Sequence, residues 1–236
     1  MRLNRIGFSR YLTLDWLNET ARLTIELDNP DEVKKVLNHT IYEIEGKEAK
    51  RKTIDVLTRT WTRVDEEHSN LQRQALELFK KAYGRERIIL HWGMLILAYP
   101  IFHDVTEQIG RLSNLQGYTT VNQVTRSIKK NWGDRTTLNR TVGRIFQSIH
   151  NWNILQQNEK QYTPTPIQTT NKTELETWLL TTLLTHHKPK PINYQDLITH
   201  PTLFPFQTKT TLRQLQNNQN IQTINQGSNI NLIKIK

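Results

Sequence analysis

The chain has 236 residues, of which 36% are hydrophobic, and a formal net charge of +10 at pH 7. It contains no cysteine, which excludes disulfides, thiolate metal ligands and cysteine nucleophiles. The most apolar stretch, Ile88–Phe102, is shorter than the roughly 20 residues that span a bilayer, and the N-terminus lacks the apolar run of a signal peptide. We therefore expect a cytoplasmic protein with no membrane partner.

The positive charge is unevenly distributed along the chain. Residues 1–107 hold 17 Lys and Arg against 17 Asp and Glu, whereas residues 108–236 hold 15 against 5. This asymmetry predicts a neutral first part for packing or partner contact and a basic second part that binds a polyanion.

Successive helices are predicted for the first 117 residues. Asn29-Pro30 combines an N-cap with a proline at the first helical position. The stretch from Arg87 to Ala98 is apolar on every side, which is typical of a central, buried helix. The expected helices are Leu14–Leu27, Asp31–Ile44, Glu48–Val64, Asp65–Ala82, Arg87–Ala98 and Pro100–Gly117.

The pattern changes after Gly117. A short helix capped by Thr119 or Thr120 and ending near Trp132, the tight turn Gly133-Asp134, and a second helix over Arg135–His150 follow one another. Residues 152–155 and 160–162 are then expected to pair as a small hairpin. Helix, tight turn, helix and hairpin is the plan of a winged helix-turn-helix.

A second, smaller module is predicted after the linker Thr163–Pro166. Thr173 and Glu176 have the spacing of a capping box that opens a helix. Short helices near 194–199 and 208–217 and two strands, 221–224 and 230–235, joined around Gly227 would complete it. We therefore expect a mainly α protein: an N-terminal multi-helix region (1–107), a winged helix-turn-helix module (108–163) and a second winged-helix-like module (171–236), each module with a short β-hairpin.

The helix over Arg135–His150 carries the candidate DNA-binding face. When Leu138, Val142 and Ile149 face the core, the opposite side presents Arg, Asn, Gln and Thr, which bind phosphates or base edges. The segment 109–151 also holds seven basic residues and one acid. The predicted nucleic-acid-binding residues are Arg126, Lys129, Lys130, Arg135, Thr136, Asn139, Arg140, Arg144 and Gln147, with Lys209 and Arg213 in the second module.

Catalytic and metal chemistry has weak sequence support. Asp31 and Glu45-Gly46-Lys47 have the order of a metal-dependent nuclease, but that site needs a strand pair, and residues 41–44 alternate only briefly among predicted helices. The eight histidines are scattered; His91 is interpreted as a core residue, and His186-His187 as complementing a helix dipole. No nucleotide-binding motif is present. We expect a protein that is not an enzyme and has no cofactor and no metal.

One stretch resembles a known family. A buried helix ends in Ala98-Tyr99-Pro100, and then Trp132, Thr136/Thr137, Arg140, Ile145 and 152–155 (Trp-Asn-Ile-Leu) follow. This pattern, over about residues 10–155, resembles the BrxA proteins of the BREX bacteriophage-defence systems, although this chain adds a module after Pro166. The resemblance implies a non-catalytic DNA-binding accessory protein that works with larger defence subunits.

These observations predict a non-catalytic accessory protein that binds duplex DNA in a prokaryotic phage-defence or regulatory assembly, together with other protein subunits. The alternative is a scaffold subunit whose winged-helix modules bind proteins, because many winged helices do so and exposed cations often only face solvent. The metal-dependent nuclease is the third hypothesis.

Overall fold

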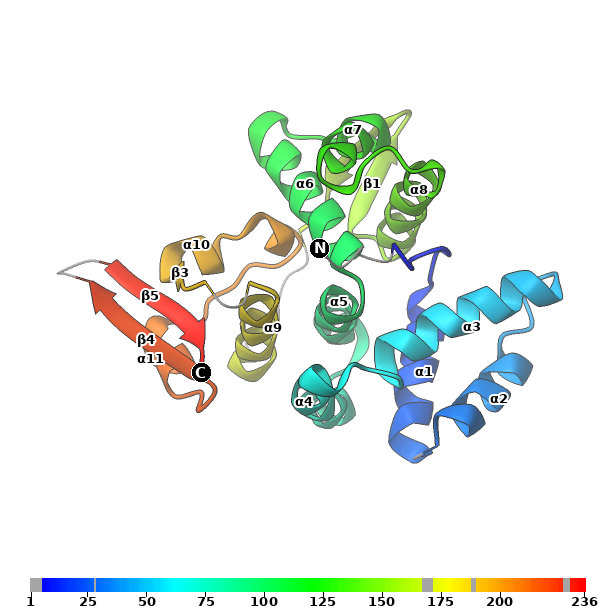
Figure 1. The fold of residues 1–236 in the computed structure, drawn as a ribbon, viewed down its shortest axis with the longest axis horizontal. Helices are drawn as coiled ribbons and strands as arrows, with labels where there is room; N and C mark the ends of the chain where they lie inside the picture. Colours follow the sequence, from blue (N-terminus) through cyan, green and yellow to red (C-terminus); the bar gives the residue numbers. More distant parts are fainter. Residues whose placement is uncertain (1–5, 28, 167–171, 188–189, 227–229) are drawn as a thin grey trace.

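The computed structural model describes residues 6–27, 29–166, 172–187, 190–226 and 230–236. Helices dominate the described chain, as predicted (Figure 1). Thr13 and Asn29 cap the first two helices by accepting hydrogen bonds from backbone N–H groups. The N-terminal helices are α1 (Leu14–Glu26), α2 (Pro30–Thr40), α3 (Lys47–Trp61), α4 (Ser69–Lys81), α5 (Arg87–Ala98) and α6 (Pro100–Gln116). The helix predicted from Asp65 is preceded by a separate 3-10 turn, η1 (Glu66–His68).

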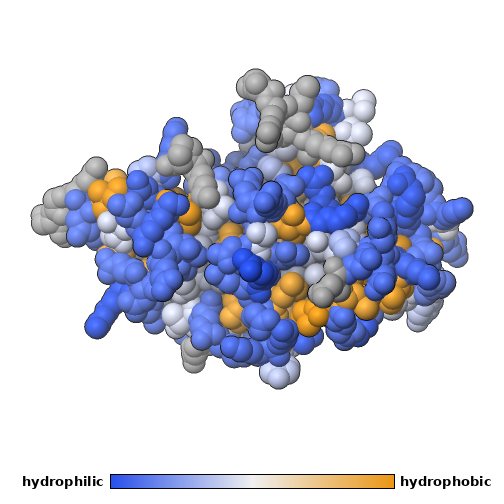
Figure 2. Space-filling view, turned by 60° about the horizontal axis from the view of Figure 1, so that its bottom comes forward, coloured by the Kyte–Doolittle hydropathy of each residue, from blue (hydrophilic) through white to orange (hydrophobic). Residues whose placement is uncertain are grey.

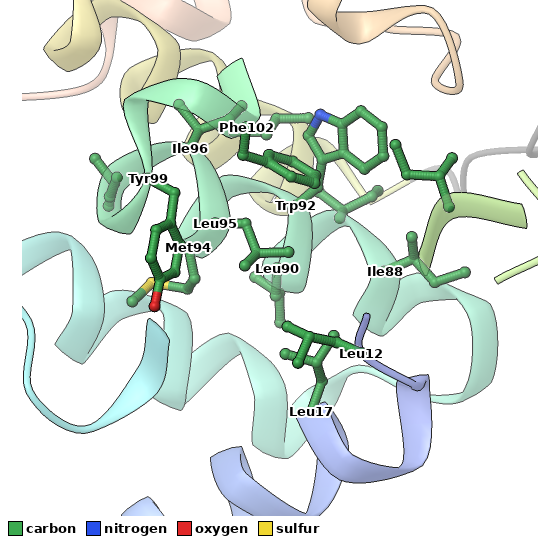
Figure 3. Close-up of a cluster of buried hydrophobic side chains, with 14 of the residues drawn as sticks. Leu12, Leu17, Ile88, Leu90, Trp92, Met94, Leu95, Ile96, Tyr99 and Phe102 are labelled. Carbon is green, nitrogen blue, oxygen red and sulfur yellow. The ribbon is translucent and has the colours of Figure 1, made fainter. Parts of the chain in front are cut away.

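Helix α5 lies at the centre of the molecule (Figure 1). Every residue from Ile88 to Leu97 is buried, because α3, α4, α6 and α9 (Thr173–His186) all pack around this helix. Figure 3 shows side chains of α5 meeting Leu17 of α1 and Phe102 of α6. The prediction of a central, buried helix is confirmed.

The first module contains the second half of α6, α7 (Val121–Trp132), α8 (Thr136–Asn151), β1 (Leu155–Asn158) and β2 (Gln161–Pro164), and the two strands pair antiparallel. The hairpin begins three residues later than predicted. The backbone N–H groups of Trp152 and Ile154 donate hydrogen bonds to carbonyls of α8, so these residues end that helix and do not join the hairpin. The Trp152 side chain is buried. The predicted linker is consequently shorter, since β2 reaches Pro164.

The second module contains α9, β3 (Ile192–Asn193), α10 (Tyr194–Ile198), the 3-10 turn η3 (Pro201–Leu203), α11 (Leu212–Gln216), β4 (Ile221–Gln226) and β5 (Ile230–Ile235). Its antiparallel sheet has the order β3-β5-β4. The predicted turn around Gly227 lies outside the described residues.

Two local predictions in this module are wrong for one shared reason. Glu176 does not close a capping box, since α9 begins at Thr173 itself and has no side-chain cap. Its buried carboxylate instead accepts hydrogen bonds from the Lys209 N–H at 2.7 Å and the Thr210 hydroxyl at 2.8 Å. These bonds hold residues 209–210 against α9 and outside any helix, and α11 (Leu212–Gln216) is only five residues long.

The buried side chains of the N-terminal helices and both modules form one continuous cluster. On the face drawn in Figure 2, hydrophilic residues cover most of the surface and hydrophobic ones form small patches. Among the described residues, no helix has both the length and the apolar character needed to cross a membrane. The division into three folding units stays a prediction. It needs a test because the three regions share one core.

Candidate nucleic-acid interface

The orientation of α8 agrees with the helical wheel. Leu138, Val142 and Ile149 are fully buried, and they bring the predicted polar face to the surface. Gly143 leaves open space on that face, since a Cβ atom there would meet nothing within 4 Å. Thr136, Asn139, Arg140 and Gln147 are exposed, and Arg135 and Arg144 are partly buried.

A basic cleft of about 680 Å³ lies between α3, α8 and the segment 7–10 that precedes α1. From α8 it receives Thr137, Arg140 and Thr141. Six cations and two carboxylates line the cleft: Arg10, Arg51, Lys52, Arg59, Arg63 and Arg140, with Asp55 and Asp65. We call this feature the basic cleft.

The cations of the basic cleft fall into two groups. Asp55 forms ion pairs with Lys34 at 2.9 Å, Arg51 at 3.1 Å and Arg63 at 3.5 Å. Burial raises the pKa of Asp55, but these cations outweigh burial and hold the pKa below its usual value, so the carboxylate is ionised at pH 7. Lys52 pairs with Glu48, which also binds Arg51.

Three guanidinium groups of the basic cleft have no carboxylate partner within the described part of the chain: Arg10, Arg59 and Arg140. The Nε atom of Arg10 is buried without a hydrogen-bond partner there. The Arg59 guanidinium lies 5.6 Å from the centroid of the Tyr99 ring. These groups retain unused N–H donors for an anion, and planar guanidinium forks suit phosphate.

The segment before α1 is fixed to α8, which brings Arg10 to the basic cleft. The Leu12 N–H donates to Ser148 Oγ at 2.9 Å, and Trp152 Nε1 donates to the Leu12 carbonyl at 2.8 Å. Next to this contact, a second hollow of about 480 Å³ is lined by Tyr11, Arg144, Gln147, His150, Asn151 and Asn153. The α8 face therefore borders two hollows, one on each side of the N-terminal segment.

The other predicted residues are not brought to these hollows. Arg126 and Lys130 are exposed on α7, while Lys129 pairs with Asp134 at 2.8 Å. Lys209 and Arg213 are exposed beside and within α11, which lies at the opposite end of the long axis from α3 (Figure 1). None of these five residues lines the basic cleft or the second hollow.

Sequence reasoning missed Arg10 and the arginines of α3. The charge balance over residues 1–107 concealed a basic stretch, because Lys47–Trp61 holds five cations and two acids. A charge count over each predicted helix finds this stretch. Its position beside α8 depends on tertiary packing.

The prediction about the histidines is corrected by the structure. Four of the eight histidines that look scattered in the sequence gather where α6, α9 and η3 meet: His103, His186, His187 and His200. Burial, followed by nearby histidines, lowers the pKa of His186 to about 3, so it is neutral at pH 7 and does not complement a helix dipole. His91 is a hydrogen-bonded core residue, as predicted.

The residues of the predicted nuclease pattern do not lie on a pair of strands. Asp31 lies in the first turn of α2, Glu45 precedes α3, and residues 41–44 form no strand. Comparisons of the chain with models of protein families, with curated proteins and with solved structures find no match. The resemblance to the BrxA proteins accordingly stays a prediction.

Proposed function

We propose that the protein binds duplex DNA without cleaving it, as an accessory subunit of a prokaryotic phage-defence or regulatory assembly. One observation carries this proposal. Arg10, Arg59 and Arg140 come from three different segments, lack a carboxylate partner within the described residues, and line one cleft beside the exposed face of α8. A phosphate backbone supplies the missing anions, and each neutralised phosphate releases counterions.

The α8 face supplies the second part of the interface. In a winged helix the second helix of the helix-turn-helix enters the major groove, and α8 has that position. Its exposed Thr136, Asn139 and Gln147 have the donors and acceptors that bind base edges, while Arg140 and Arg144 reach phosphates or guanine. The basic cleft then fixes the position of the duplex, and α8 reads it.

The test measures the affinity of the full chain for a labelled DNA duplex at several salt concentrations. Fluorescence anisotropy of the DNA reports the binding. We expect the affinity of the wild type to fall steeply with salt. Arg59→Ala/Arg140→Ala removes two phosphate contacts, so it should lower the slope of log K against log salt by about 2.

A matched control is Lys80→Ala/Lys81→Ala, which removes the same charge from exposed positions on α4. It should bind as the wild type does. A flat salt response, or equal losses in the two double variants, would contradict the proposal. A stoichiometric protein complex without DNA affinity would favour the scaffold alternative, and Mg²⁺-dependent cleavage lost in Glu45→Ala would favour the nuclease.

A further inference from the structure

A cluster of histidines lies where α6, α9 and η3 meet. His103 lies in the first turn of α6, His187 ends α9, and His200 caps η3. One ring nitrogen from each of these three histidines lies within 4.8 Å of the other two. We call these three residues the histidine triad.

The triad has the spacing of metal ligands. The Nε2 atoms of His187 and His200 are 3.3 Å apart. In a tetrahedral site with Zn–N distances of about 2.0–2.1 Å, two ligand nitrogens are also about 3.3 Å apart. The ring planes cross at 74° for His187 and His200, at 83° for His103 and His187, and at 36° for His103 and His200.

His103 provides an independent observation. Its side chain is 4% exposed, and its Nε2 atom is buried without a hydrogen-bond partner in the described residues. Its Nδ1 atom lies 3.1 Å from Asp104 Oδ1, and the other carboxylate oxygen accepts a hydrogen bond from Trp132 Nε1 at 2.7 Å. A carboxylate that holds one imidazole nitrogen and leaves the other free is the usual support of a metal-binding histidine.

We propose that His103, His187 and His200 bind one Zn²⁺ ion, which fastens the end of α9 and the segment before η3 to α6. Imidazole nitrogens suit zinc, and a buried site without thiolates can be closed by a carboxylate or a water molecule. Glu107 offers such a carboxylate, with Oε1 3.9 Å from His200 Nε2. The same carboxylate forms an ion pair with Arg111, in which Glu107 Oε1 lies 2.6 Å from Arg111 Nη2.

Hydrogen bonds within the cluster do not satisfy every ring nitrogen of the histidine triad. His200 Nδ1 accepts the Thr202 N–H at 3.3 Å, which places the proton of His200 on Nε2, facing His187. That arrangement still leaves His103 Nε2 buried with no hydrogen-bond partner among the described residues. Zinc binding moves the His200 proton from Nε2 to Nδ1, so the Thr202 N–H must turn away from that nitrogen. Two long hydrogen bonds of 3.3 Å, to Thr202 and to His187, are given up in exchange for three metal–nitrogen bonds.

His186 is not assigned as a ligand. Its ring stacks on His103, with centroids 3.9 Å apart and planes at 29°, and its ring nitrogen groups with His103 and Asp104, whereas His187 and His200 group with His103 alone. Burial lowers the pKa of His187, and that of His200 to about 3, so both rings are neutral at pH 7, as metal ligands must be.

The first test is a titration of the chelator-treated full chain with Zn²⁺ by calorimetry and with Co²⁺ by visible absorption. We expect one equivalent of each ion and the strong bands of tetrahedral Co²⁺. His187→Gln, at a partly buried helix end, should weaken zinc binding at least about 10-fold, since it removes a ligand. Asp104→Asn should weaken it by about 10–100-fold by releasing His103.

The matched control is His39→Gln, which removes an exposed histidine outside the cluster and should leave both titrations unchanged. Zinc should also raise the Tm of the wild type and of His39→Gln, but not that of His187→Gln. Equal zinc affinity in the wild type and in a folded His187→Gln variant, judged by circular dichroism, would overturn the proposal. A wild-type Tm that does not respond to zinc would overturn it as well. None of these measurements involves DNA.

Discussion

His91 illustrates how much a single side chain depends on its surroundings. It lies inside the apolar helix α5, accepts a hydrogen bond from Trp61 Nε1 at 3.2 Å and lies 3.0 Å from Asn18 Oδ1. Burial, assisted by the charge of Arg87, lowers the pKa of His91 to about 3. The position in an apolar helix was enough to predict a core histidine, but its two partners come from α1 and α3.

This pKa shift predicts a loss of stability in acid. In the unfolded chain a histidine takes up a proton near pH 6.5, whereas folded His91 stays neutral down to about pH 3. The contribution is complete above pH 6.5 and is lost as the pH falls toward 3, by about 1.4 kcal/mol per pH unit. His186 and His200 act in the same direction. Urea unfolding of the chelator-treated chain between pH 7 and pH 4.5 measures this slope.

The variant His91→Gln isolates one of these contributions. Glutamine retains an acceptor for Trp61 and a donor for Asn18 but does not titrate. We expect lower stability at pH 7 and an acid slope that is shallower by about 1.4 kcal/mol per pH unit. The exposed His39→Gln should leave the slope unchanged. A slope in His91→Gln as steep as that of the wild type would show that His91 is not the titrating group.

Among the elements, the junction between the N-terminal segment and α8 decides where the basic cleft forms. Ser148 Oγ accepts the Leu12 N–H, and its own hydroxyl donates to the Arg144 carbonyl. Ser148 is fully buried, so water does not replace it as a partner. The amphipathic pattern of α8 does not identify Leu12, 136 residues away, as the partner of Ser148.

Ser148→Ala should therefore destabilise the protein. It leaves the buried Leu12 N–H without an acceptor, at an expected cost of about 1–3 kcal/mol in the free energy of unfolding. Urea denaturation measures the loss. Thr40→Ala is the control, since Thr40 is exposed and its hydroxyl bonds only within α2, so its effect should stay within about 0.5 kcal/mol. Equal effects of the two variants would mean that the junction contributes nothing.

At the scale of the whole molecule, the second module packs on α5 and α6 at close range. A Cβ atom at Gly110 of α6 would collide with the Pro201 carbonyl, and one at Gly93 of α5 would collide with the Trp178 ring. Trp92 of α5 also packs edge-on against Phe206, with centroids 5.5 Å apart. These contacts predict that the described regions unfold together, in one transition seen alike by circular dichroism and tryptophan fluorescence.

Gly110→Ala tests this packing. The added methyl group must push η3 away from α6, which should cost about 1–3 kcal/mol and lower the cooperativity of unfolding. Gly143→Ala is a control of opposite sign. Its helix has open space at that position, so alanine should stabilise the protein by up to about 1 kcal/mol. Similar changes in the two variants would contradict the close approach of Gly110 to Pro201.

The sequence by itself determined the features that repeat along one element. Apolar spacing located the helices, the bounds of α5, and the side of α8 that faces solvent, because these depend on neighbours within a few turns. The role of Glu176, the start of the hairpin, the basic cleft and the histidine triad were decided only by the tertiary structure. Each of them joins residues from distant segments, and a one-dimensional pattern does not carry the packing that makes them neighbours.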